Sequence, residues 1–72
     1  MTTKYQNLYN YVQGKPHMED TYTVLYKHHV ETALRPGMRK MLKILHSKGS
    51  SKQEQQMSLH TIDEVFHPFL NP

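Results

Sequence analysis

The chain has 72 residues, a formal net charge of +3 and no cysteine. A chain of this length forms at most one domain, so we expect a single domain over residues 1–72. The lack of cysteine excludes disulfides, thiolate metal sites and thiol catalysis. Leu, Ile, Val and Phe make up only 15 of the 72 residues, so we expect a marginal core that a second copy, giving a homodimer, or another partner can complete.

No stretch of the sequence resembles a targeting or membrane segment. The first residues contain no apolar run of the kind found in secretion signals. No window approaches the roughly 18 apolar residues of a membrane span. We therefore expect a soluble, intracellular protein of the cytoplasm, with no membrane contact.

The first predicted element is a helix over residues 4–13. Four residues recur with the i, i+3, i+4, i+7 spacing of one helix face: Tyr5, Leu8, Tyr9 and Val12. Thr3 and Gln6 fit a capping box at the start of this helix. Gly14 suits its end, because glycine favours the residue just past a helix.

Residues 18–34 fit two alternatives. As a helix, the segment places six residues on one stripe: Met18, Tyr22, Leu25, Tyr26, His29 and Ala33. As a strand, residues 21–28 are rich in β-formers and would give an α+β fold. The helix accounts for more residues, so we favour it, with Glu19 or Asp20 in its first turn. Because the residue before a proline tends to leave the α region, we expect this helix to end at Arg35.

Residues 36–49 predict a two-sided helix. Its apolar residues have helical spacing: Met38, Met41, Leu42 and Leu45. At about 100° per residue, the opposite face is cationic: Arg39, Lys40 and Lys43. Pro36 suits the first helical position, and Gly49 suits a left-handed residue past the end.

The C-terminal part combines a polar segment and a short helix. Residues 49–57 are polar and lack periodicity, so we expect a loop or linker. Thr61 then begins a second capping box, before a helix over residues 62–67. An interior proline removes a backbone hydrogen bond, so we expect the next proline to end this helix. Phe69 and Leu70 would then fold back as an anchor.

The repeated helical spacing predicts the fold class. All four segments carry an apolar face with the same periodicity, which several helices sharing one core require. We therefore predict an all-α fold, a small compact bundle of three to four short helices. The alternative is an α+β fold with a strand near residues 21–28.

The positive charge is concentrated in mid-sequence. There is no acidic residue between Glu31 and Glu54, and this window holds six of the nine lysines and arginines: Arg35, Arg39, Lys40, Lys43, Lys48 and Lys52. A helix that is apolar inward and cationic outward can lie against a nucleic-acid groove. We therefore predict that these six residues contact DNA or RNA, in a non-enzymatic regulatory protein of the transcription-regulator type.

The same helix allows other interpretations. It can be the solvated face of an ordinary helix, or it can dock on an anionic protein surface. The second case would make the chain a protein-binding inhibitor or adaptor, for example of viral or mobile-element type, acting on a host protein such as a component of the transcription machinery. Four methionines favour it, because flexible thioethers suit adaptable surfaces: Met18, Met38, Met41 and Met57. The alternative is that they fill gaps in the core, which is the commoner case for Met38 and Met41.

The histidines and acids do not form a recognisable catalytic or metal motif. His28 and His29 point about 100° apart on a helix, whereas paired helical metal ligands are spaced i, i+4. We interpret His29 as a buried or half-buried core residue, which would make folding pH-sensitive. No G-x-S-x-G or phosphate loop is present. We therefore expect no catalytic residue, no metal or other cofactor, and no small-molecule substrate.

Overall fold

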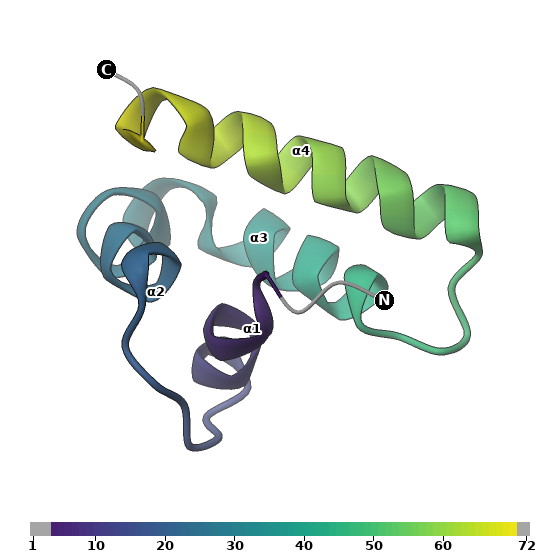
Figure 1. Cartoon of the computed structure of the whole chain (residues 1–72), viewed down its shortest axis with the longest axis horizontal. Coiled ribbons are helices and arrows are strands. Elements are labelled where there is room, and N and C mark those ends of the chain that lie inside the picture. The colour runs from purple at the N-terminus through teal and green to yellow at the C-terminus, as the bar shows by residue number, and fades with distance from the viewer. Residues whose placement is uncertain (1–3, 71–72) are drawn as a thin grey trace. The chain divides into compact units, whose positions relative to one another are not determined.

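The computed structural model describes residues 4–70, and for residues 30, 31, 33 and 34 it describes the backbone alone. In this part of the chain all regular structure is helical (Figure 1): α1 (Gln6–Val12), α2 (Thr21–Leu25), the π-helical segment η1 (Tyr26–Val30), α3 (Glu31–Leu45) and α4 (Lys52–Leu70). The predicted all-α class is confirmed. The alternative strand over residues 21–28 is wrong, because these residues belong to α2 and η1.

The chain divides into two compact units, Met1–Arg35 and Pro36–Pro72. The division falls inside α3, so the predicted helix end at Arg35 and the predicted helix start at Pro36 are both wrong. The φ angle of proline, about −65°, is itself helical, so a helix can pass through proline while losing one backbone hydrogen bond. That the whole chain acts as a single domain stays a prediction.

The first helix begins without a side-chain cap. Tyr5 occupies the N-cap position and no side chain bonds to the first turn there. Thr3, the predicted cap, lies outside the described residues. The Nε2 of Gln6, its predicted partner, donates forward to Oδ1 of Asn10 at 3.1 Å. The helix ends as predicted before Gly14, whose φ of 76° lies in the left-handed region that glycine adopts without steric cost.

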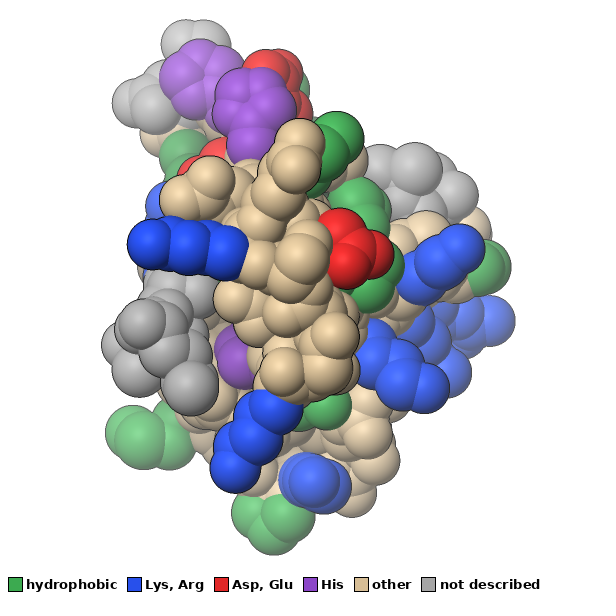
Figure 2. Space-filling view, turned by 90° about the vertical axis from the view of Figure 1, so that its right-hand side faces the viewer, with side chains coloured by type: hydrophobic (Ala, Val, Ile, Leu, Met, Phe, Trp, Pro, Cys, Tyr) green, Lys and Arg blue, Asp and Glu red, His purple; other side chains and the backbone are tan. Residues whose placement is uncertain are grey.

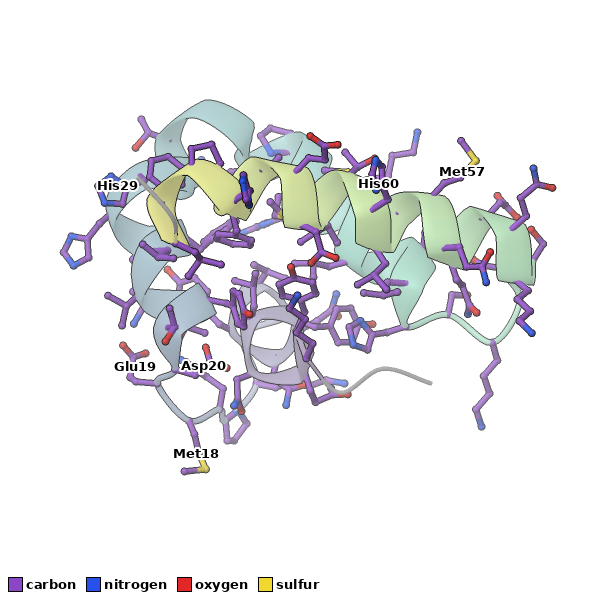
Figure 3. The ribbon with its side chains drawn as sticks, turned by 45° about the horizontal axis from the view of Figure 1, so that its top comes forward. Met18, Glu19, Asp20, His29, Met57 and His60 are labelled. Atoms are coloured by element: carbon purple, nitrogen blue, oxygen red, sulfur yellow. The ribbon has the colours of Figure 1, made fainter. Side chains whose placement is uncertain are left out.

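The second helix begins at a complete capping box. The backbone N–H of Thr23 donates to Oδ1 of Asp20 at 2.9 Å, and the backbone N–H of Asp20 donates to Oγ1 of Thr23 at 2.8 Å. These reciprocal bonds satisfy donors that the first helical turn leaves free. Met18 lies before this helix and is 75% exposed, so it is not part of the predicted apolar stripe (Figure 3).

Tyrosines form much of the core of the first unit, in which α1 packs against α2. Tyr5, Leu8 and Tyr26 are buried, as the helical spacing predicts. The ring of Tyr22 meets the Tyr5 ring edge-on, with 4.8 Å between centroids. Tyr11, which the spacing puts off the inner face, is half-buried, and its ring centroid lies 5.9 Å from that of Tyr26. Edge-on aromatic pairs of this kind contribute about 0.5–1.5 kcal/mol beyond their buried area.

The second unit is a helical hairpin, in which residues 46–51 join the second part of α3 to α4 (Figure 1). The buried side chains of α3 are spaced i, i+4, i+7: Met38, Leu42 and Leu45. Those of α4 are spaced i, i+4, i+8: Ser58, Ile62 and Phe66. The apolar stripe predicted for residues 36–49 is therefore present, with Met41 half-buried at its edge.

The last helix begins directly after Ser51, so the predicted loop over residues 49–57 is wrong for its second part. The backbone N–H of Ser51 donates to Oε1 of Glu54, and the backbone N–H of Glu54 donates to Oγ of Ser51, both at 3.1 Å. This capping box starts the helix in a polar sequence. Nε2 of Gln55 also donates to the carbonyl of Ser47 at 2.9 Å, which ties the first turn to the preceding segment.

The ends of α3 and α4 also differ from expectation. Gly49 does not adopt the left-handed conformation predicted for it. Thr61 is not an N-cap but lies inside α4, where its hydroxyl donates to the carbonyl four residues earlier at 2.9 Å. The helix passes through Pro68 and includes Phe69 and Leu70, which are 41% and 40% exposed and do not fold back as an anchor.

Candidate nucleic-acid interface

The side of α3 opposite its buried residues carries three exposed cations: Arg39, Lys40 and Lys43. With about 100° between successive residues, their three directions span about 100° of the helix circumference. Arg39 and Lys43 are separated by about 6 Å along the helix axis, with Lys40 between them. Three positive groups therefore face solvent together from a little over one helical turn.

Two further predicted cations belong to the same unit. Lys48 lies in the segment before α4 and Lys52 is the first residue of α4, and both are exposed. Arg35 is also exposed, but it closes the first unit, so the interface within the second unit consists of the other five cations. Figure 2 views the side on which residues 46–51 lie, and shows Lys and Arg side chains projecting from several places, with one group at the right edge.

The five cations of the second unit form no ion pair with any acid whose side chain the structure describes. The first acid of the second unit is Glu54, and its carboxylate accepts the Ser51 N–H. The ammonium and guanidinium groups thus stay in water with their charge uncompensated. A cationic face of this kind attracts anions over a distance of about a Debye length, roughly 8–10 Å in physiological salt.

A second polar face, which was not predicted from the sequence, lies on α4. Four side chains spaced i, i+3, i+4, i+7 line an open hollow of about 380 Å³: His60, Asp63, Glu64 and His67. Nε2 of His60 lies 3.0 Å from Oε1 of Glu64. Among the side chains that the structure describes, no group of three His, Cys, Asp or Glu is placed to hold a metal ion. This face could have been predicted from the sequence, because the spacing i, i+3, i+4, i+7 places side chains on one side of a helix, whether they are apolar or polar.

The interpretation of His29 as a core residue is wrong. His29 is exposed and projects from the ribbon (Figure 3). It belongs to η1, where the π-helical turn holds more residues than an α-helical turn. The α-helical angle per residue therefore no longer gives the direction of its side chain. The burial on which the predicted pH-sensitive folding rested is therefore absent at His29.

Comparison with protein-family models, curated proteins and solved structures finds no match for this chain. Across the described residues, no helix is both long enough and apolar enough to cross a membrane. The residues of the chain and their geometry therefore carry the evidence for what it binds.

Proposed function

We propose that the protein binds nucleic acid, DNA or RNA, through its phosphate backbone and acts as a non-enzymatic regulatory protein of the transcription-regulator type. The observation that supports this proposal is the uncompensated cationic face of α3, formed by Arg39, Lys40 and Lys43. Lys48 and Lys52 extend the positive charge beyond the helix.

The physical driving force is the release of counterions. Each phosphate that a lysine or arginine neutralises frees condensed cations into solution, and this gain falls as the salt concentration rises. Five cations, with no base-specific contact assumed, correspond to a dissociation constant of about 10⁻⁴–10⁻⁶ M in physiological salt. An affinity in this range suits a protein that associates reversibly with a long polymer.

The one-sided sign of the charge favours this function over a merely solvated helix face. A surface that only needs to stay in water can carry mixed charges, and soluble proteins usually intersperse both signs. Here six cations and no acid lie between Glu31 and Glu54. The acids of the described second unit lie on α4 and are three: Glu54, Asp63 and Glu64.

The test is an electrophoretic shift with duplex and single-stranded probes over a salt series of about 50–200 mM, in which affinity is expected to fall log-linearly. The double variant Lys40→Glu, Lys43→Glu is expected to abolish the shift while its circular dichroism stays helical. Lys15→Glu is the control, because Lys15 is exposed and belongs to the first unit. No shift at low salt with any probe would exclude the proposal.

A second candidate is a protein-binding inhibitor or adaptor with an acidic partner. It is supported by Met57, which is 62% exposed on α4 and points away from the ribbon (Figure 3). Such side chains adapt to varied partner surfaces. Affinity capture with and without nuclease distinguishes the two candidates, because a protein partner stays bound after nuclease and a nucleic-acid-mediated one does not.

A further inference from the structure

We infer that the nucleic acid bound by this face is a duplex, and that the protein contacts its backbone without distinguishing base sequence. This inference rests on the proposed function and specifies the form of its ligand. Three features of the second unit lead to it: the absence of Phe, Tyr and Trp from residues 36–53, the placement of three cations on a regular helix, and the absence of exposed amide and hydroxyl side chains from that part of α3.

Single-strand binding normally needs aromatic rings on which unpaired bases stack, each worth about 1–3 kcal/mol. Residues 36–53, which carry the five cations, contain no Phe, Tyr or Trp. Of the aromatic rings on α4, Phe66 is buried and Phe69 lies in the last turn, where it already makes a contact. All five tyrosines belong to the first unit. A single strand would thus gain little beyond electrostatic attraction here.

A duplex presents the cations with more phosphate charges per unit length than a single strand does. Double-stranded DNA carries one charge per about 1.7 Å of axis, against about 3.4 Å for each strand alone. Arg39, Lys40 and Lys43 are held at regular spacing on α3, so their backbone positions lose no further freedom on binding. A stiff duplex likewise loses less conformational freedom than a flexible single strand does. Both partners are therefore pre-organised only in the duplex case.

Base recognition would need different side chains on the exposed part of α3. Bases are read mainly by arginine, lysine, asparagine, glutamine and hydroxyl side chains, and of the two cations only arginine presents a planar fork of donors. The exposed residues of α3 in the second unit include no amide and no hydroxyl: Pro36, Gly37, Arg39, Lys40 and Lys43. The exposed amides Gln53 and Gln56 lie on α4, where they line a hollow that contains none of the five cations. Arg39 is thus the single side chain on this part of α3 with a rigid fork of donors for a guanine edge, and Lys40 and Lys43 would contact bases only as flexible point charges.

The inference is tested by fluorescence anisotropy at low salt with labelled duplexes and with their separated strands, at equal phosphate number. Two DNA duplexes of different base composition and one RNA duplex are compared, so that DNA and RNA are distinguished. We expect duplexes to bind about tenfold more tightly than single strands, because no stacking compensates the single strand. We expect the two DNA duplexes to agree within about threefold, because each base-specific pair would add about 1–3 kcal/mol.

Two matched variants identify the face. Lys43→Gln is expected to reduce the salt slope by about one unit, whereas Lys15→Gln leaves it unchanged. Arg39→Lys keeps the charge and removes the bidentate donor, so the ratio between the two DNA duplexes is expected to stay the same.

Each contrary result has a distinct meaning. Single strands that bind as tightly as duplexes overturn the duplex inference and leave the proposed function standing. A preference above about tenfold for one DNA duplex, lost in Arg39→Lys, overturns the lack of sequence reading. Failure to bind any probe overturns the proposed function and this inference together.

Discussion

The ammonium of Lys27 lies 2.7 Å from Oε1 of Glu19, and the same oxygen lies 3.1 Å from Nε2 of His17. The Lys27 ammonium also lies 4.9 Å from the centre of the Tyr11 ring, and the His17 ring lies 5.2 Å from the Tyr11 ring, edge to face. Through these contacts His17 and Glu19, which lie between α1 and α2, attach that segment to Tyr11 of α1 and to Lys27 of η1. The four side chains form a closed set of contacts on the surface of the first unit.

This arrangement predicts a pH-dependent contribution to stability. Hydrogen bonds from Lys27 and then from His17 lower the pKa of Glu19. A carboxyl whose pKa is lowered by folding stabilises the protein above its ordinary pKa, and the contribution is lost as the pH falls through the lowered value. We expect Glu19→Gln to lower the melting temperature slightly at about pH 7 and to have a smaller effect at acidic pH, as the wild-type carboxyl becomes protonated.

The control for this prediction is a double-mutant cycle with Lys27→Met. If the ion pair carries the effect, the double variant melts at a temperature above that expected from adding the two single effects. The effect is small because Glu19 is exposed and solvent screens the pair. Strict additivity at both pH values would contradict the assignment.

The cap of α2 gives a second prediction. Asp20→Ala removes the acceptor of the Thr23 N–H, and we expect a loss of about 1 kcal/mol in the free energy of unfolding. Asp20→Asn keeps an oxygen acceptor and is a comparable cap, so it is expected to change stability by only a few tenths of a kcal/mol. Urea denaturation followed by circular dichroism measures both. Equal losses in the two variants would show that the charge, and not the cap, is important.

These elements show which features could be predicted from the sequence. The apolar stripe of α3 and the outward direction of Arg39 follow from the α-helical period alone. Ser51 and Glu54 carried a readable capping signature, but the glutamines that follow lack an apolar face until Met57, so composition pointed to a loop. His29 could not be placed, because nothing in the sequence period marks the π-helical turn that contains it.

The helices continue through Pro36 and Pro68, contrary to the prediction, for an energetic reason. A proline inside a helix costs about 3 kcal/mol or more, which is a local penalty. Near Pro36 and Pro68 the helix carries the fully buried side chains Met38 and Phe66. Each of these contributes about 1.5–3 kcal/mol on burial, which is of the same order as the local cost of the proline. Tertiary packing of this kind is not visible in a single sequence.

Substitution by alanine is expected to change stability in opposite directions at two glycines. A Cβ added at Gly37 meets no atom within 4 Å, and the residue lies in a helix without positive φ. Gly37→Ala is therefore expected to raise the free energy of unfolding by about 0.5–1 kcal/mol. A Cβ at Gly14 also meets nothing, but its φ of +76° is strained for alanine. Gly14→Ala is therefore expected to destabilise by about 1 kcal/mol. Thermal unfolding of both variants tests the pair, and a shift of the same sign in both would contradict it.

The two phenylalanines of α4 test whether the helix continues through Pro68. Phe66 is 0% exposed, whereas Phe69 is 41% exposed. Replacing a buried phenylalanine by alanine costs about 3–5 kcal/mol, because it removes buried area and leaves a cavity. Since a chain of this size has a net stability of only about 3–5 kcal/mol, Phe66→Ala is expected to be largely unfolded at room temperature. Phe69→Ala loses only partly buried area and is expected to remain folded, with a lower melting temperature. A helix that ended before Pro68 and folded its tail inward would instead make both variants comparably unstable, and circular dichroism at matched temperature separates the two cases.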